Sequence, residues 1–225
     1  MTAPSARGLF RATGKKGKPV HMRAEDGDIV KIEALPREEN DFYPTPPEPT
    51  RAFLNAESAR LKDFPLIWEP ACGGGAMVRE IRAAGHACIG TDLVQRWPDG
   101  ADFHQADFMR SRKSLAPAIV TNPPYDHVNW RDGKGRWITH AIDVLGVEYM
   151  ALLLSWSWPG AGGLAGIWTR HPPARVYLMR WKIDFTGAGA PPMLNGWFVW
   201  DDAAQGETVL RMLDRSDDAR QEVLL

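Results

Sequence analysis

Short apolar runs alternate with amphipathic stretches between residues 51 and 201 of this chain. An apolar run of roughly four to eight residues between turn formers indicates a buried strand, whereas apolar positions three or four apart indicate a helix. Helices are predicted over 51–61, 76–85 and 137–146, and 163–173 begins as one. Strands are predicted at 65–70, 87–92, 117–122, 149–156, 175–181 and 196–201, with a shorter one near Phe103.

Strands that alternate with helices favour an α/β fold, in which a mostly parallel, Rossmann-like sheet has helices on both faces. The last two strands are joined by a loop without a helix, which predicts a C-terminal antiparallel hairpin at the sheet edge. The proline-rich segment YPTPPEPT (43–50) is expected to be an extended connector. The expected organisation is a loose N-terminal extension (1–40) with a short hairpin near 28–35, one domain over 41–205 and an acidic tail over 206–225.

Composition sets broad limits on the class of protein. With 225 residues, 44% of them hydrophobic and 24% charged, the chain can bury a sizeable core. No apolar run has the length of a membrane span, and the N-terminus lacks a signal-peptide pattern. The two cysteines, Cys72 and Cys88, fit neither a CxxC motif nor a metal-ligand spacing. We therefore expect a cytoplasmic protein without a metal site or a membrane partner.

The N-terminal 23 residues carry basic side chains and no acidic ones. They form either a solvated tail or an arm that contacts phosphates. The net charge of −1 favours the tail, because strong non-specific nucleic-acid binding usually accompanies a basic chain. The phosphate contacts of such an arm would come from Arg11, Lys15, Lys16 and Lys18.

A glycine-rich turn follows the first predicted strand of the domain. Glu69 ends that strand, and three glycines (73–75) precede the next helix. Glycines at such a turn let the backbone approach a ligand closely. Asp92 ends the next strand, nineteen residues after Gly73, where an acid can accept both hydroxyls of a ribose. The pair indicates a nucleoside-containing cofactor; a tight turn with a surface aspartate is the alternative.

Three motifs together resemble a known family. Glu69, Gly73 and Gly75 match Glu-x-x-x-Gly-x-Gly, NPPY (122–125) follows the fourth strand, and DFYPTP (41–46) lies upstream of both. This order resembles that of phage and bacterial DNA N(6)-adenine methyltransferases, which are class I S-adenosylmethionine-dependent enzymes of the NPPY type. The resemblance implies methyl transfer from S-adenosylmethionine to the exocyclic amine of adenine in DNA.

In this family the tetrapeptide Asn122, Pro123, Pro124 and Tyr125 would be catalytic. The side-chain oxygen of Asn122 and the backbone carbonyl of Pro123 would accept the two hydrogens of the amine, which directs its lone pair at the methyl group. The prolines set the direction of that carbonyl in advance, and Tyr125 offers a stacking face. The alternative is a proline turn at the end of a strand.

The resemblance also implies a set of cofactor contacts. Asp107 would bind the amine of the cofactor's adenine and Phe108 would lie against its face. Thr45 and Tyr43 would meet the methionine carboxylate, and Glu69 would lie near the ammonium group. Cys72 has no histidine partner in sequence, so it is interpreted as a small spacer in the cofactor turn.

The DNA substrate would be single-stranded, or a duplex from which the target base is flipped. A second aromatic residue would cover the base; Phe185 is preferred over Trp181 and Trp197. The loop 126–137 is either a solvated connector or a substrate contact that stacks on bases and binds phosphates. Its candidate contact residues are Trp130, Arg131, Lys134 and Arg136.

Many related enzymes carry a separate target-recognition region, and this chain has no insertion longer than a loop. Relaxed or very short sequence specificity is therefore expected. Two alternatives remain: the same fold and cofactor with RNA or a protein glutamine as acceptor, or an inactive protein that binds nucleic acid. The sequence leaves the oligomeric state open.

Overall fold

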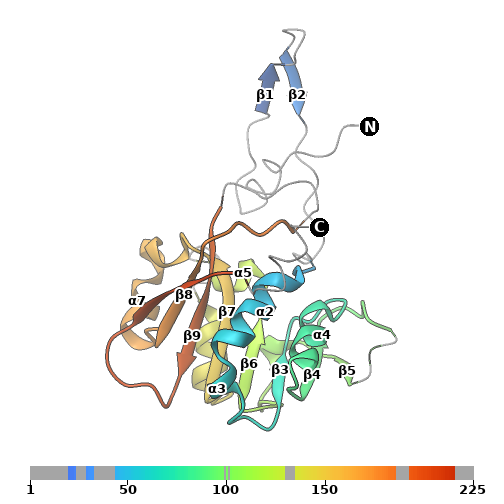
Figure 1. The fold of residues 1–225 in the computed structure, drawn as a ribbon, viewed down its shortest axis with the longest axis vertical. Coiled ribbons are helices and arrows are strands. Elements are labelled where there is room, and N and C mark those ends of the chain that lie inside the picture. Colours follow the sequence, from blue (N-terminus) through green and yellow to red (C-terminus); the bar gives the residue numbers. More distant parts are fainter. Residues whose placement is uncertain are drawn as a thin grey trace.

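The computed structural model describes residues 20–23, 29–32, 44–98, 100, 102–129, 135–185 and 193–215. Within these residues, eight strands form one sheet in the order β10-β8-β9-β7-β6-β3-β4-β5 (Figure 1). The strands from β7 to β5 are parallel to one another, and β9 is antiparallel to its neighbours β7 and β8. The bounds are β3 Ile67–Glu69, β4 Cys88–Asp92, β5 Phe103–Gln105, β6 Ala118–Thr121, β7 Tyr149–Ser155, β8 Arg175–Met179, β9 Asn195–Asp201 and β10 Val209–Leu213.

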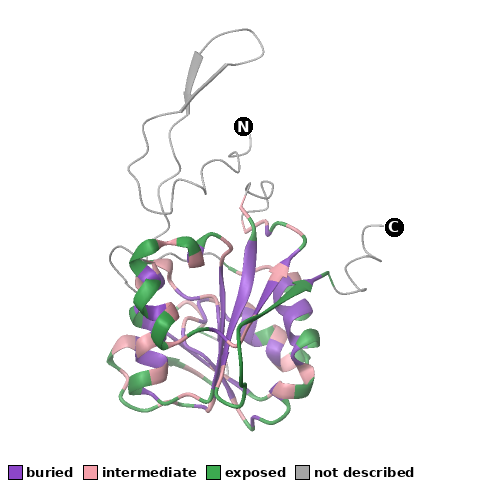
Figure 2. Cartoon of the chain, turned by 90° about the vertical axis from the view of Figure 1, so that its left-hand side faces the viewer, coloured by how far each residue is buried: buried purple, intermediate pink, exposed green. Residues whose placement is uncertain are grey.

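The predicted α/β class is confirmed, and each face of the sheet packs against its own layer of helices (Figure 2). Successive side chains of a strand point to opposite faces. In β6, Ala118 and Val120 join the core beneath α2 (Pro47–Ala56) and α4 (Ala76–Ala83), whereas Ile119 joins the core beneath α6 (Arg136–Thr139) and α7 (Ala165–Arg170). All three side chains are fully buried, which explains why the strands read as continuous apolar runs.

The helices are short and lie where the sequence predicts them, with local differences. The segment 137–146 forms α6 and then a π-helix rather than one α-helix. Short 3₁₀ turns fill several loops. The bounds are α2 Pro47–Ala56, α3 Ser58–Leu61, α4 Ala76–Ala83, η2 Phe108–Arg110, α5 Tyr125–Val128, α6 Arg136–Thr139, π-helix η3 His140–Val144, η4 Trp158–Gly160, η5 Gly162–Leu164 and α7 Ala165–Arg170.

The proline-rich segment 43–50 was expected to be wholly extended, and this is wrong for its second half. Helix α2 begins at Pro47, with Pro46 at the N-cap position. Proline fits the first turn of a helix because the N–H groups there have no intrahelical partner. The extended part therefore ends at Pro46, and α2 fixes the position of Pro44–Pro46.

Two expectations about the C-terminal part need correction. The antiparallel hairpin of β8 and β9 is present, but it does not form the sheet edge, because a further strand, β10, pairs with the outer side of β8. The domain was expected to end at residue 205, whereas Val209–Leu213 form β10, which pairs with β8 in parallel and is the outermost strand. Its apolar residues Val209, Leu210 and Met212 are about half exposed, so they do not read as a buried strand.

A buried ionic cluster fastens α2 to the sheet at the edge opposite the glycine turn. The carboxylate of Glu57, 4% exposed, accepts hydrogen bonds from the Arg175 guanidinium and from the hydroxyls of Tyr149 and Tyr177. Burial would raise the pKa of Glu57, but the hydrogen bonds from Arg175 and Tyr177 outweigh it and lower that pKa. Arg175 also pairs with Asp201 at 2.9 Å.

Two short strands, β1 (Val20–Arg23) and β2 (Ile29–Ile32), pair antiparallel within the segment expected to be a loose extension with a hairpin. The four basic residues of the proposed arm lie outside the described residues. No helix in the described ranges is long and apolar enough to cross a membrane.

Candidate active site

The candidate site lies at the carboxyl ends of β3 and β6, between which the strand order of the sheet reverses. β3 and β6 are parallel neighbours, and the strands that follow each of them extend the sheet to opposite sides. Crevices outside the carboxyl ends of two such strands are the usual ligand sites of open α/β sheets. Glu69 ends β3 and Thr121 ends β6, so the glycine turn and NPPY (122–125) leave the sheet side by side.

The glycine turn has the backbone shape that its sequence predicts. Gly73 and Gly75 have φ values of 50° and 78°, in the left-handed region that glycine tolerates best. A Cβ atom at Gly75 would lie 2.5 Å from the ring of Trp97, so there is also no space for a side chain. The N–H of Gly73 donates to Asp92 at 2.8 Å, which joins the turn to the end of β4.

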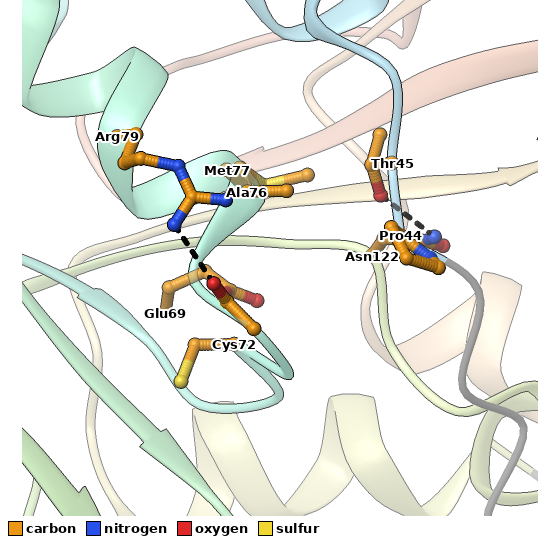
Figure 3. A pocket seen from close by; sticks show the side chains of 9 residues that line it. Pro44, Thr45, Glu69, Cys72, Ala76, Met77, Arg79 and Asn122 are labelled. Atoms are coloured by element: carbon orange, nitrogen blue, oxygen red, sulfur yellow. Dashed lines mark hydrogen bonds between the residues drawn. The ribbon is translucent and has the colours of Figure 1, made fainter. Parts of the chain in front are cut away.

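A cavity of about 130 Å³ opens between the glycine turn and NPPY (122–125) (Figure 3). This is smaller than the roughly 300–1,000 Å³ of sites that enclose a whole small ligand, so it fits one end of a nucleoside-containing cofactor. The residues around it come from segments far apart in the chain. They are Pro44, Thr45, Glu69, Cys72, Gly74, Ala76, Met77, Arg79 and Asn122.

Thr45 and Asn122 lie next to each other on one side of this cavity, opposite Glu69 and Arg79 (Figure 3). The Nδ2 group of Asn122 donates to the Thr45 hydroxyl oxygen at 3.1 Å (Figure 3). The Oδ1 atom of Asn122 is buried and has no hydrogen-bond partner among the described residues. A buried acceptor without a partner is costly, and beside a cavity a bound ligand or water can supply that partner. The contact with Thr45 therefore leaves the oxygen of Asn122 to accept from an incoming group.

Glu69 is the buried acid of the cavity, with 2% of its surface exposed. Burial raises its pKa to about 8; the nearby Asp92 adds to the rise, and a hydrogen bond from Thr121 opposes it. That bond joins Thr121 Oγ1 to Glu69 Oε1 at 2.7 Å. Thr121 directly precedes Asn122, so this hydrogen bond joins Glu69 to the end of β6 that leads into NPPY (122–125).

The interpretation of Cys72 as a spacer agrees with its surroundings. Burial, with the charges of Glu69 and Asp92, raises the pKa of its thiol far above the usual range. A thiol that stays protonated is a poor nucleophile. Gly90 lies so close that an added Cβ would be 3.0 Å from the Cys72 sulfur, so the side chain fills space between β3 and β4.

Asp92 lies at the end of β4 as predicted, but both of its carboxylate oxygens already have partners. One accepts from Gly73, and the other accepts from the N–H of Val94 at 2.9 Å and from Arg96 Nη1 at 3.2 Å. A ribose at this carboxylate would compete with Arg96. Of the three contacts only the ion pair with Arg96 involves a partner side chain, so a rotation of that side chain can release it.

Asp107 and Phe108 follow β5 at the same edge of the sheet, yet neither lines the cavity. Asp107 caps the turn that follows it by accepting from the N–H of Met109 at 2.9 Å. Phe108 is 3% exposed and stacks on Trp137 with ring centroids 4.0 Å apart. In this structure the Phe108 ring therefore has no open face, contrary to the stacking role that the resemblance implies.

Tyr125 begins α5 directly after the two prolines and is half-buried. Of the three candidates for the opposite face of the base, Trp197 is fully buried and stacks on Phe53, so it belongs to the core. Phe185 and Trp181 are partly exposed at the periphery of that core.

Arg79 is a site residue that the sequence did not single out. Among the described residues around the cavity it is the only basic one; its Nη1 donates to the carbonyl of Gly74 at 2.8 Å (Figure 3). Its guanidinium also lies 5.7 Å from the ring centroid of Trp97. The sequence does carry one signal for Arg79: it lies four residues after Gly75, in the first turn or so of a helix. Helical side chains tilt toward the N-terminus, which directs Arg79 back to the glycine turn.

Several predicted contacts fall outside the described residues: Tyr43, Trp130, Arg131 and Lys134. Arg136 is described at the start of α6. Within the described part of the chain, no group of three or more His, Cys, Asp or Glu side chains could hold a metal ion.

Solved structures share this arrangement of the sheet. A protein from Listeria monocytogenes, assigned as a class I S-adenosylmethionine-dependent methyltransferase, matches 77% of this chain and 66% of its own, with 13% identity and a TM-score of 0.50. A protein from Pyrococcus horikoshii, assigned as an RNA methyltransferase, matches 71% of this chain and 85% of its own, with 9% identity and a TM-score of 0.52. The fold is that of class I methyltransferases.

A third methyltransferase-fold neighbour comes from Vibrio vulnificus and is assigned as the modification subunit of a type I restriction enzyme. It matches 76% of this chain, with 13% identity and a TM-score of 0.51, and this chain spans 46% of its length. By sequence, the chain matches no protein-family model and no curated protein. The structural similarity supports a shared fold, and sequence identities this low leave the methyl acceptor undefined.

Proposed function

We propose that this protein transfers a methyl group from S-adenosylmethionine to the exocyclic amine of adenine in DNA. The observation that carries the proposal is the buried, unpartnered Oδ1 of Asn122 beside a cavity bounded by the glycine turn. An acceptor fixed in this position suits an amine that must lose its planarity to react. The motif NPPY (122–125), at the carboxyl end of β6, adds the carbonyl of Pro123 and the ring of Tyr125.

The cavity fits the amino-acid end of the cofactor. It has one buried acid, Glu69, suited to an ammonium group, and one base, Arg79, suited to a carboxylate. When bound, S-adenosylmethionine supplies an electrophilic methyl group on a sulfonium, which leaves as a neutral thioether. Asp92 would hold the ribose in exchange for Arg96, and Asp107 remains the candidate for the adenine amine.

The residues of the chain position the acceptor. Asn122 Oδ1 and the Pro123 carbonyl take the two N–H groups of the amine, and its lone pair then points at the methyl carbon. The amine nitrogen would then gain the methyl group as the sulfonium leaves as a thioether, and the surplus proton on nitrogen would pass to solvent. No nucleophilic side chain takes part, which agrees with the protonated thiol of Cys72.

DNA is the proposed partner, either single-stranded or with the target base flipped out of a duplex. Tyr125 would stack on one face of the base and Phe185 on the other. The loop 126–137, including Arg136, would contact the backbone. Sequence specificity for the DNA target is proposed to be relaxed or short, because the sequence has no insertion longer than a loop that could form a separate target-recognition region. The protein is proposed to work in the cytoplasm.

The test uses purified protein, S-adenosylmethionine and three acceptors: unmethylated DNA, RNA and a glutamine-containing peptide. The DNA is digested to nucleosides, and N(6)-methyladenine is quantified by mass spectrometry. Asn122→Ala should abolish the product, whereas Asn55→Ala, a change at an exposed site on α2, should not.

Methylation of RNA or of the peptide alone would reassign the acceptor and keep the chemistry of the site. Binding of the cofactor without transfer to any of the three acceptors would contradict the enzymatic proposal and support an inactive binding protein.

A further inference from the structure

Asn195 is a buried polar residue that the proposed chemistry leaves unexplained. It begins β9 opposite Ser155, the last residue of β7, at the same edge of the sheet as NPPY (122–125). Its relative exposure is 0%, and its Oδ1 has no hydrogen-bond partner among the described residues. An apolar residue would fill this position without leaving a buried acceptor unpaired, so stability alone does not account for an asparagine here.

The side chain of Asn195 reaches the catalytic motif. Its Nδ2 donates to the carbonyl of Leu154 at 3.4 Å and to the hydroxyl oxygen of Tyr125 at 3.5 Å. The Leu154 carbonyl can only accept, which fixes the orientation of the amide. Tyr125 therefore accepts in this contact, while the unpartnered Oδ1 belongs to the same carboxamide. Within the described residues, Tyr125 is the only side chain that hydrogen-bonds to Asn195.

The support behind Asn195 is rigid. β9 lies between β7 and β8, and the next residue, Gly196, approaches so closely that an added Cβ would lie 2.9 Å from the Tyr177 carbonyl. Tyr125, by contrast, starts a single helical turn and is half-buried. The contact thus joins a single helical turn to a strand that is paired on both sides, and it involves the ring that would stack on the acceptor base.

We propose that Asn195 is a positioning residue that holds the phenol of Tyr125 at the stacking angle required for transfer. The stacking role of Tyr125 rests on the proposed function, whereas the hydrogen bond between Asn195 and Tyr125 does not. A stacking ring that is pre-oriented loses less freedom when the base arrives, so the benefit appears in the transfer step. Cofactor binding should be unaffected, since Asn195 does not line the cavity.

The contact is tested first without any acceptor. The chain has four tyrosines, so protein labelled with 3-fluorotyrosine should give four ¹⁹F resonances. Tyr125→Phe identifies one of them. We expect Asn195→Ala to shift that resonance and Asn55→Ala, at an exposed site, to leave it in place. An unmoved Tyr125 resonance in folded Asn195→Ala would overturn the proposal.

The role in transfer is tested by a double-mutant cycle under single-turnover conditions. Asn195→Ala and Tyr125→Phe should each slow transfer roughly fivefold to tenfold, the usual effect of one lost hydrogen bond. The double variant should be no slower than either single one, with the Kd for S-adenosylhomocysteine unchanged. Multiplying losses would show that Asn195 acts independently of the phenol and would refute positioning.

If Asn195→Ala does not fold, Asn195→Ser replaces it in the double-mutant cycle. Tyr125→Phe removes the same hydrogen bond from the half-buried partner, so the cycle can still be completed. If the native protein methylates no acceptor, the proposed function fails, and the ¹⁹F shift still decides whether Asn195 holds Tyr125.

Discussion

The hydroxyl oxygen of Thr45 accepts a hydrogen bond from the Nδ2 group of Asn122, 77 residues further along the chain, at 3.1 Å. A carboxamide has one donor end and one acceptor end; in this structure the donor end of Asn122 faces Thr45, and its Oδ1 has no partner among the described residues. Under the proposed function, this arrangement leaves Oδ1 of Asn122 to accept from the amine of the acceptor. We propose that Thr45 orients Asn122, besides the carboxylate contact that the sequence predicts for it.

The first prediction concerns this contact. Thr45→Val keeps the shape of the side chain but removes the acceptor, so the amide of Asn122 can rotate and the transfer rate should fall about tenfold, while Thr45→Ser should retain it. In an Asn122→Asp background both ends of the side chain are acceptors, and the same Thr45→Val change should cost about twofold or less. Equal losses in the two backgrounds would contradict an orienting role. Single-turnover methyl transfer measures all four variants.

The second prediction concerns Arg79. As the basic residue of the cavity it should pair with the cofactor carboxylate, and Arg79→Gln should weaken S-adenosylhomocysteine binding about tenfold, less at high salt. Arg112→Gln, at an exposed site without a described contact, is the matched control. Isothermal titration calorimetry at two salt concentrations gives the comparison. Unchanged affinity in Arg79→Gln would leave this arginine as a surface residue that packs on Trp97.

The third prediction follows from Glu69, whose pKa burial raises from 4.5 to about 8. Below pH 4.5 the group is protonated in both the folded and the unfolded state. Between the two values only the unfolded state ionises, so the free energy of unfolding falls as pH rises through this window, by about 5 kcal/mol at most. Glu69→Gln should flatten this part of the profile in urea unfolding between pH 5 and 8.5. The exposed Glu207→Gln change should preserve it, and parallel profiles for native protein and Glu69→Gln would disprove the assignment.

The fourth prediction concerns the buried cluster around Glu57. Glu57→Gln leaves the Arg175 guanidinium with an incomplete set of anionic partners, which should lower the free energy of unfolding by about 3 kcal/mol. Because the folded-state pKa of Glu57 lies below its ordinary value, its stabilisation is present above that value and is lost as pH falls through the folded pKa. Urea unfolding at pH 7 and pH 4 should therefore show a larger difference at pH 7. Glu207→Gln serves again as control, and a difference that grows toward acid pH would be inconsistent with a lowered pKa.

The sequence predicted the fold class and most strands, and placed its candidate site residues at strand ends, for local reasons. Buried parallel strands are continuous apolar runs, the prolines after Thr121 end β6, and left-handed glycines mark the turn at 73–75. Because the carboxyl ends of parallel strands share one edge, Glu69 and Asn122 both line the cavity at that edge.

The partners of each side chain were decided by the tertiary structure. No local pattern indicates that Thr45 orients Asn122, that Trp137 covers Phe108, or that Arg96 occupies Asp92. The half-exposed β10 lacks the apolar period of a buried strand, and Asn195 became a candidate only because β9 is inserted beside β7. Periodicity and backbone limits act over a few residues, whereas these contacts depend on which strands become neighbours in the folded sheet.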